Sequence, residues 1–204
     1  MKIVVIGATG TIGKGIVNVL QPHHEIIPVG HTGGDFRVDL GSKDSITGLF
    51  QDIGTVDAIV SAAGLARFGT LAELSEEDFL LGLHHKLMGQ VHLVQIGVDH
   101  IADLGSITLT SGVLSREPIP GSAAISMANA GLEGFVRAAA LESPRGIRIN
   151  AVSPIWVSET LESMGKDGSD GIPSDRTALA YKASVEGTLN GEVLDVRDYA
   201  SSGS

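Results

Sequence analysis

Residues Gly7-Ala8-Thr9-Gly10-Thr11-Ile12-Gly13 follow directly on the apolar run Lys2–Ile6 and open a segment of helical character. Glycines at this spacing suit a phosphate-binding turn. One glycine makes the tight turn, one lets the backbone approach a pyrophosphate, and one lets helix and strand pack closely. The helix N-terminus adds unpaired N–H groups and a partial positive charge. Because a strand precedes the motif and a helix follows it, we interpret it as a dinucleotide-binding turn. A packing turn without nucleotide is the alternative. The expected ligands are Gly7, Thr9, Gly10, Thr11, Ile12 and Gly13.

The rest of the chain alternates short apolar runs with longer segments of helical periodicity. Apolar runs without polar alternation are typical of strands buried on both faces of a parallel sheet. Their alternation with helices indicates right-handed βαβ units. We therefore predict a doubly wound α/β sheet of about seven parallel strands with helices on both faces. It forms a single domain over residues 1–200, followed by a tail at 201–204. The predicted strands are Lys2–Ile6, Glu25–Val29, Phe36–Val38, Ala58–Ser61, Ser106–Thr110, Arg148–Val152 and Glu192–Val196, and the predicted helices are Thr11–Leu20, Lys43–Asp52, Ser75–Leu104, Ala123–Leu141 and Asp175–Glu186.

Composition narrows the possible functions. The 204 residues are enough for one ordinary domain, and 14 basic against 24 acidic residues give a net charge of −10. That balance speaks against a nucleic-acid or anionic-membrane surface. Cysteine is absent, which excludes disulfides, thiol catalysis and thiolate metal sites. No apolar run is long enough to span a membrane, and the first residues do not form a signal peptide. We expect a cytoplasmic protein with a small-molecule substrate and neither a nucleic-acid nor a membrane partner.

The end of the second predicted strand indicates which dinucleotide binds. An acidic residue there would accept both ribose hydroxyls and repel a 2′-phosphate. Gly30 stands at that position, and His31 and Thr32 can donate hydrogen bonds to a phosphate. NADP(H) is therefore favoured over NAD(H), which stays possible because a register shift would bring Asp35 into the acidic position. The alternative for His31 is a solvated loop histidine.

Together with several later segments, these residues resemble the short-chain dehydrogenase/reductase family, and the resemblance covers nearly the full length of the chain. The resemblance implies a Rossmann-like fold and oxidoreductase activity. It also implies that Asp39 and Leu40 lie beside the adenine ring and that Pro154 and Val157 belong to the turn that holds the nicotinamide carboxamide. Besides the glycine turn, the segments that resemble the family are Asp39-Leu40, Ser61-Ala62-Ala63-Gly64, residues 134–142, residues 146–154 and residues 191–196. The resemblance implies that Ala62, Ala63 and Gly64 contact the cofactor.

The catalytic positions depart from the family pattern of a Tyr and a Lys four residues apart on one helix. That spacing puts the Lys ammonium beside the phenol and lowers the phenol pKa, so that it can act as a general acid. Here Ile125 stands at the Tyr position and Asn129 at the Lys position, while Lys86 occupies the Asn position of the preceding helix. Lys86 can serve the nicotinamide ribose or a substrate oxygen, and Asn129 can hydrogen-bond a ribose hydroxyl. The alternative is that Lys86 is a solvated helix residue.

Other candidates for acid–base chemistry are few. Ser111 ends a predicted strand and can donate to a carbonyl oxygen, although no general base is evident beside it; a plain strand-end serine is the alternative. Tyr181 is expected to pack rather than to donate a proton. Among the histidines, His85 beside Lys86 is a possible proton relay, and the spacing of the others does not indicate a metal site.

Two functions therefore stay open. The first is an NADP(H)-dependent oxidoreductase of the short-chain dehydrogenase/reductase type, acting on a small carbonyl or conjugated enone, with Ser111, Lys86 and Asn129 as its catalytic candidates. The second is an NADP(H)-binding sensor or scaffold without redox activity. The polar, glycine-containing segment Glu159–Asp175 is expected to cover the substrate as a lid. Members of the resembled family pair through two long helices, so we also expect a homodimer or homotetramer.

Overall fold

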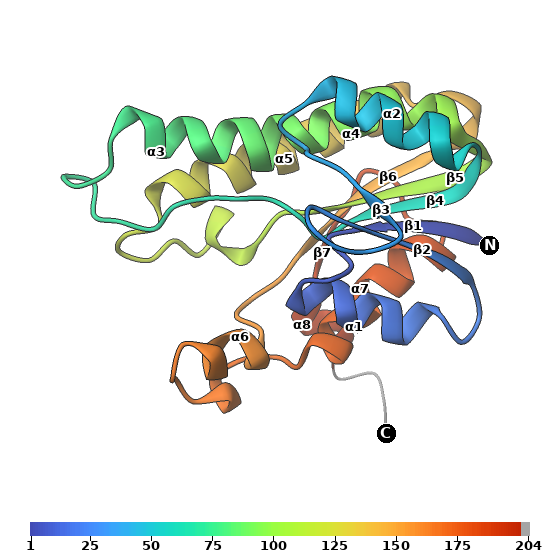
Figure 1. Cartoon of the computed structure of the whole chain (residues 1–204). Helices are drawn as coiled ribbons and strands as arrows, with labels where there is room; N and C mark the ends of the chain where they lie inside the picture. The colour runs from blue at the N-terminus through green and yellow to red at the C-terminus, as the bar shows by residue number, and fades with distance from the viewer. Residues whose placement is uncertain (201–204) are drawn as a thin grey trace.

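Seven parallel strands form one sheet, in the order β3-β2-β1-β4-β5-β6-β7, in the computed structural model, which describes residues 1–200 (Figure 1). The predicted doubly wound sheet is thereby confirmed, and the predicted tail at 201–204 lies outside the described residues. The strand order reverses between β1 and β4, where ligands bind in folds of this kind. The strands are β1 Lys2–Ile6, β2 Glu25–Gly30, β3 Phe36–Arg37, β4 Val56–Ser61, β5 Ile101–Thr110, β6 Arg148–Ser153 and β7 Val193–Asp195.

Helices cover both faces of the sheet. In Figure 1, α2, α4 and α5 lie above the strands and α1, α7 and α8 lie below them, while α6 projects beyond the sheet at the lower left. A π-helical segment, η1 (Gly82–Met88), joins α3 to α4. The α-helices are α1 Thr11–Leu20, α2 Lys43–Ile53, α3 Glu76–Leu81, α4 Gly89–Gly97, α5 Ala123–Glu142, α6 Ser158–Ser163, α7 Ser174–Glu186 and α8 Val196–Ala200, and the short 3₁₀ turns are η2 Val98–His100, η3 Val113–Ser115, η4 Pro144–Gly146 and η5 Gly168–Asp170.

The apolar runs of the central strands account for the two cores. Successive side chains of a strand point to opposite faces. In β1, Val4 and Ile6 belong to the core under α2, α4 and α5, whereas Ile3 and Val5 belong to the core over α1 and α7. All four side chains are buried. A strand that is buried on both faces has apolar side chains at successive positions. For this reason apolar and polar residues do not alternate along Lys2–Ile6.

The predicted strands Phe36–Val38 and Glu192–Val196 are one residue too long at their C-terminal ends, and a larger departure lies at the end of the predicted helix Ser75–Leu104. The helix expected to continue to Leu104 ends at Gly97, and β5 begins at Ile101. Ile101 is buried and pairs with Val56, after which the register shifts and Leu104 adopts φ +64°. Ile101 and Leu104 continue the apolar spacing of the helix, so the local pattern did not reveal the bulged strand.

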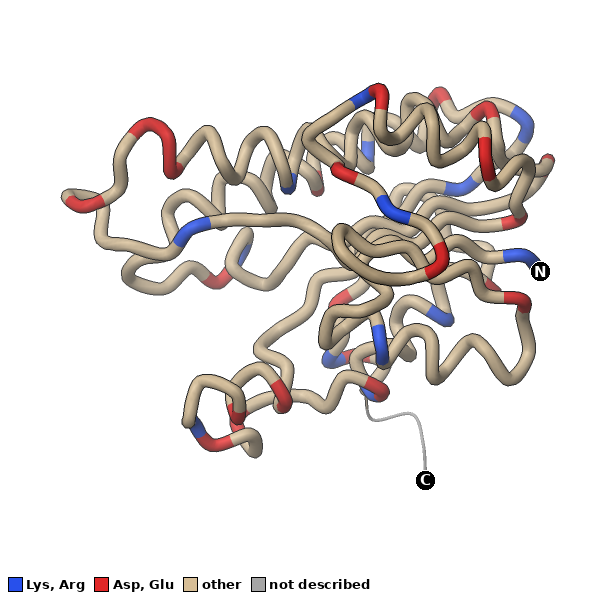
Figure 2. Tube along the Cα trace, viewed as in Figure 1, with Lys and Arg blue, Asp and Glu red and all other residues tan. Residues whose placement is uncertain are grey.

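Charged residues lie mostly on the loops and helices rather than on the central strands, as Figure 2 shows along the trace. Within residues 1–200, the charged side chains that are buried are Lys86, Glu133 and Asp195. A buried charge requires a specific reason, because desolvation is unfavourable unless partners compensate for it. Across the same residues, no helix combines the length and apolar character needed to cross a bilayer.

Candidate active site

The glycine turn forms a closely packed cradle between β1 and α1. Gly7 has φ +82°, and a Cβ there would lie 2.8 Å from the carbonyl oxygen of Ala62. A Cβ on Gly13 would lie 2.0 Å from the carbonyl oxygen of Gly7, so helix and turn can approach only without a side chain. Gly10 is the N-cap of α1 and carries no capping side chain. The first N–H groups of the helix are therefore available to an anion.

A cavity of about 450 Å³ opens beside this turn, over the carboxyl ends of β1 and β2. Gly30 lines it and Asp35 does not. A Cβ on Gly30 would lie 2.3 Å from the carbonyl oxygen of Gly33, so this loop does not accommodate an acidic residue at the end of β2. The predicted cofactor residues that line the cavity are Gly7, Thr9, Gly10, His31, Asp39, Leu40, Ala62, Ala63 and Gly64, and His85 also lines it.

The remaining predicted cofactor residues lie outside this cavity. Thr11 and Gly13 belong to the first turn of α1, and the exposed Thr32 follows β2. Val157 is buried and forms a bridge with Ile172. Ile12 and Pro154 line a second cavity instead.

The second cavity, of about 250 Å³, adjoins the first and shares Ala62, Ala63 and Gly64 with it. It brings together Lys86, Ser111 and Asn129, the three catalytic candidates. Its other walls are largely apolar and come from Ile12, Phe68, Gly112, Val113, Leu114, Ile125, Pro154, Ile155 and Trp156. Two adjoining cavities, one beside the glycine turn and one apolar with a few polar groups, match the layout of a cofactor site and a substrate site.

Lys86 is buried, which rules out the alternative of a solvated helix residue. It lies in the π-helical segment η1, a distortion that is frequent at functional sites. Its Nζ donates to the carbonyl oxygens of Thr110, at 3.3 Å, and Ser111, at 3.2 Å. Gly64 packs against the stem of the side chain, and a Cβ there would lie 2.9 Å from Lys86 Cγ. Burial lowers the pKa of the Lys86 amine to about 8.

Asn129 and Ile125 lie one turn apart on α5 and line the same cavity as Lys86. Asn129 is 1% exposed; its Nδ2 donates to the carbonyl oxygen of Gly112 at 3.3 Å, whereas its buried Oδ1 has no hydrogen-bond partner. A buried acceptor without a partner is unfavourable unless a ligand or water satisfies it. Ile125 presents only hydrocarbon where the family pattern has a phenol.

Ser111 has an acidic partner that the sequence did not reveal. Its Oγ donates to Glu133 Oε1 at 2.9 Å, and Ser115 Oγ donates to the same oxygen at 2.5 Å. Glu133 is 4% exposed, and its second oxygen lies 3.5 Å from Arg137. The expectation that no base stands beside Ser111 was therefore wrong. The two residues are 22 positions apart, and only the packing of α5 against the end of β5 joins them.

Tyr181 packs in the core, as expected. It is fully buried on α7, and its hydroxyl pairs with the hydroxyl of Thr110 at 2.7 Å. Burial raises the pKa of the Tyr181 phenol, so the side chain holds its proton. Tyr181 does not line the apolar cavity, so it does not supply a proton donor there.

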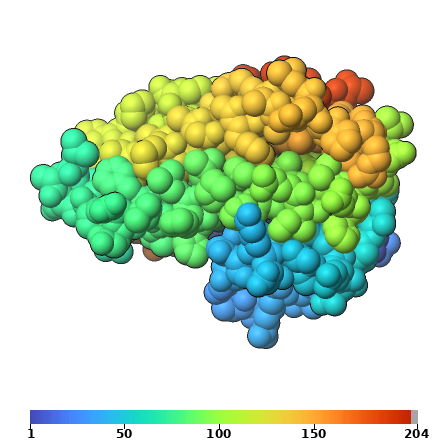
Figure 3. All heavy atoms as spheres, turned by 90° about the horizontal axis from the view of Figure 1, so that it is seen from above, coloured from blue at the N-terminus to red at the C-terminus, as the bar shows by residue number. Residues whose placement is uncertain are grey.

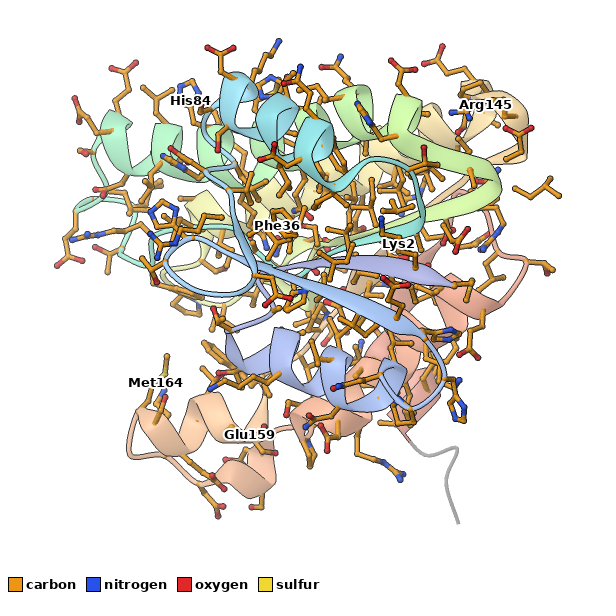
Figure 4. All side chains as sticks on the ribbon, turned by 45° about the vertical axis from the view of Figure 1, so that its right-hand side comes forward. Lys2, Phe36, His84, Arg145, Glu159 and Met164 are labelled. Atoms are coloured by element: carbon orange, nitrogen blue, oxygen red, sulfur yellow. The ribbon has the colours of Figure 1, made fainter. Side chains whose placement is uncertain are left out.

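Two aromatic side chains from distant parts of the chain meet at the rim of the apolar cavity. Phe68 follows β4 and Trp156 follows β6; their ring centroids are 5.9 Å apart with 28° between the planes. Lys166 lies 5.9 Å from the Trp156 ring. The segment beyond Trp156 contains α6, and Figure 4 shows Glu159 and Met164 on that lobe, below and beyond the sheet. Sequence reasoning missed this aromatic pair because neither residue belongs to a motif.

The histidines do not gather into a metal site. His85 lines the larger cavity, and the ring of His100 stacks on Phe50 at 5.3 Å between centroids. Over residues 1–200, no group of three or more His, Cys, Asp or Glu side chains is arranged to hold a metal ion.

Solved structures and curated reductases similar to this chain are known. The crystal structure of the protein lin1944 from Listeria innocua superposes with a TM-score of 0.92 at 40% identity, covering 96% of this chain and 99% of that one. A small-chain dehydrogenase in complex with NADPH gives a TM-score of 0.83 at 26% identity, covering 98% of each chain. Hydroxynaphthalene reductase arp2 of Aspergillus fumigatus is 28% identical over 164 residues, which are 74% of this chain and 60% of that protein.

The chain thus spans less than two thirds of the length of that curated relative. A family model described as enoyl-(acyl carrier protein) reductase matches residues 20–189, which are most of the chain. The match includes the residues that line the two cavities after the glycine turn and α1. Together with the sheet order and the structures above, this match shows that the chain belongs to the short-chain dehydrogenase/reductase family.

Proposed function

We propose that the chain is an NADP(H)-dependent oxidoreductase that reduces a small apolar substrate, and that a conjugated enone suits its site best. The observation that carries the proposal is the pair of adjoining cavities, which share Ala62, Ala63 and Gly64. One is bounded by the glycine turn and the other contains Lys86 and Asn129. A dinucleotide laid across the shared wall would bring its two ends into the two cavities.

The residues present fit this cofactor. Gly7 and Gly13 leave space that a Cβ would fill, and Gly10 leaves the first N–H groups of α1 open to a pyrophosphate. At the other end of the cavity no carboxylate occupies the end of β2, and His31 and Thr9 can donate to a 2′-phosphate. The similar dehydrogenase found with NADPH supports this preference. Bound NADPH supplies hydride; the protein supplies orientation.

The protein side of the chemistry lacks a phenolic acid. Ile125 cannot donate a proton, Tyr181 points its hydroxyl at Thr110, and the hydroxyl of Ser111 is bonded to Glu133. Lys86 and the open acceptor of Asn129 are the polar groups left to orient a substrate oxygen or the cofactor ribose. Reduction of an isolated ketone needs a proton on oxygen as hydride arrives. Reduction of a conjugated C=C bond yields a carbanion equivalent that solvent can protonate.

The names of similar proteins support the same substrate classes. The matching family model is described as an enoyl reductase, and the fungal relative as a hydroxynaphthalene reductase. An enoyl thioester has a conjugated C=C bond. The apolar cavity, with Phe68 and Trp156 stacked at its rim, suits a small planar substrate of this kind.

A second candidate is an NADP(H)-binding sensor or scaffold without turnover. The observation that favours it is the hydrocarbon side chain of Ile125 at the position of the general acid. Purified protein with NADPH and a panel of aldehydes, ketones, enones and enoyl thioesters separates the two. Oxidation of NADPH at 340 nm with an enone supports the oxidoreductase. NADPH binding without turnover on any member of the panel supports the sensor.

We further propose that two copies pair through α4 and α5. These helices lie side by side in the green and yellow surface of Figure 3, and neither is covered by another part of the described chain on that face. Ala138 and Ala139 on α5 permit close approach of a second helix, and Met88 and Met127 expose apolar side chains. A homodimer or homotetramer is the expected assembly.

A further inference from the structure

Lys86 stands in surroundings that do not suit a permanent ammonium. Within residues 1–200, the hydrogen-bond partners of its Nζ are the carbonyl oxygens of Thr110 and Ser111, and no carboxylate forms an ion pair with it. The side chain is 8% exposed and is packed against Gly64. A buried cation without a counter-charge favours its neutral form, and a neutral lysine amine is a nucleophile.

Two ionisable side chains close to Lys86, Glu133 and His85, have other contacts. Glu133 on α5 accepts from Ser111 and Ser115 and lies near Arg137. His85, the next residue on η1, lines the other cavity and lies against Gly41, where a Cβ would be 2.8 Å from its Cε1. The Glu133 carboxylate is held by Ser111, Ser115 and Arg137 and forms no ion pair with Lys86.

The cavity that Lys86 lines is suited to a carbonyl compound. Its walls are mostly apolar, its volume is about 250 Å³, and the buried Asn129 Oδ1 has no partner. An acceptor without a partner can receive the hydroxyl of a tetrahedral adduct, and Asn129 lines the same cavity as Lys86. We propose that the Lys86 amine is a carbonyl-reactive group that forms a Schiff base with an aldehyde or ketone bound in this cavity.

The reaction balances without an external oxidant or reductant. The neutral amine nitrogen adds to the carbonyl carbon, and the carbonyl π electrons move to oxygen. The oxygen then leaves as water with the two hydrogens of the amine, and a C=N bond replaces the C=O bond. With a conjugated enone, the protonated imine draws electrons from the C=C bond and makes its far carbon electrophilic. The inference thus rests on the substrate cavity of the proposed function and gives that cavity a way to activate an enone without a phenol.

The test is reductive trapping of the wild-type chain with benzaldehyde and sodium cyanoborohydride at pH 7, without NADPH. The trap delivers hydride to the C=N carbon and leaves a benzyl group on the amine. Peptide mapping by mass spectrometry gives the rate at each lysine, with the exposed Lys43 on α2 as the internal control. At pH 7, a pKa of about 8 makes the free-amine fraction of Lys86 roughly three hundred times that of an ordinary lysine. We expect Lys86 to be benzylated about tenfold faster than Lys43 or more, since burial offsets part of that gain. We also expect the rate to saturate with benzaldehyde concentration.

Two variants complete the test. Lys86→Met should remove the fast, saturable labelling and leave Lys43 unchanged; Lys86→Arg keeps a cation but cannot form the imine, and carries the test if the methionine variant does not fold. Labelling of Lys86 no faster than that of Lys43, or fast labelling that survives in either variant, would overturn the inference. An NADPH titration of the same wild-type sample keeps the two claims apart. NADPH binding without Lys86 labelling refutes the Schiff base alone, and Lys86 labelling without NADPH binding refutes the proposed cofactor alone.

Discussion

Substitutions at Gly13, Gly48 and Gly10 separate the contribution of the glycine turn to folding stability from its contribution to NADPH binding. In Gly13→Ala the new Cβ would lie 2.0 Å from the carbonyl oxygen of Gly7 and 2.7 Å from the carbonyl carbon, both backbone atoms. Since ordinary van der Waals contact begins near 3.4 Å, α1 must shift away from the turn by about 1 Å or more. Overpacking of this kind costs about 1–3 kcal/mol. For a chain of this size, each kcal/mol lowers the melting temperature by roughly 2–4 °C.

Gly48→Ala is the matched control, because Gly48 lies on α2 and nothing lies within 4 Å of its added Cβ. Alanine is the better helix former, so this variant should gain about 0.5–1 kcal/mol. Gly10→Glu supplies the binding variant. Its Cβ would be 3.3 Å from the carbonyl oxygen of Gly7, a tight but tolerable contact, while the carboxylate would enter the larger cavity and oppose a pyrophosphate.

The assay is a thermal melt of each variant with and without NADPH. We expect Gly13→Ala to melt lower than wild type and to bind NADPH weakly, because the N-terminus of α1 is displaced. We expect Gly10→Glu to melt within a few degrees of wild type but to lose the stabilisation by NADPH. Gly48→Ala should keep that stabilisation in full. A Gly13→Ala chain as stable as Gly48→Ala, or a Gly10→Glu chain still stabilised by NADPH, would refute the reasoning.

Four further outcomes follow from the same structure. His31→Asp should weaken NADPH binding and improve NADH binding, because a carboxylate repels the 2′-phosphate; an unchanged affinity ratio by isothermal titration would place His31 outside the site. Because burial holds the pKa of Lys86 at about 8 and the unfolded chain keeps the ordinary value of 10.5, the unfolded state binds more protons between these values. Wild-type stability should therefore rise with pH across that window relative to Lys86→Met, and parallel melting profiles of the two chains would contradict this. Asn129→Lys should lower the melting temperature more at pH 6 than at pH 9, since two ammonium groups then share one cavity; equal losses at both pH values would argue against it. Light scattering at micromolar concentration should give the mass of a dimer or tetramer, and a monomer mass would refute pairing through α4 and α5.

The fold could be predicted from local pattern because its strands are buried on both faces. A continuous apolar run such as Lys2–Ile6 indicates a buried strand, and the spacing of the glycines after it indicates a turn that leads into a helix. The same approach was wrong at Ile101, where an apolar residue in helical spacing begins a bulged strand. That choice depends on pairing with Val56, a contact 45 positions away along the chain that no local window contains.

Part of the site could likewise be predicted from the sequence, and part of it could not. Gly7, Gly10 and Lys86 could be identified because a motif or a departure from a motif singles them out, and the structure gathers them at one edge of the sheet. The burial of Lys86 could not be predicted, because it depends on Gly64 and the end of β5 closing around the side chain. Glu133 could not be paired with Ser111 either, since a carboxylate on α5 reads as a surface charge until the helix is docked.

The central claim is that one dinucleotide lies across both cavities with its nicotinamide end beside Lys86 and Asn129. A crystal structure of the chain grown with NADPH tests it most directly. We expect pyrophosphate oxygens at the N–H groups that follow Gly10, the 2′-phosphate beside His31, and the nicotinamide ring in the cavity that Ile125 lines. NADPH bound elsewhere, or bound with its nicotinamide ring outside that cavity, would contradict it.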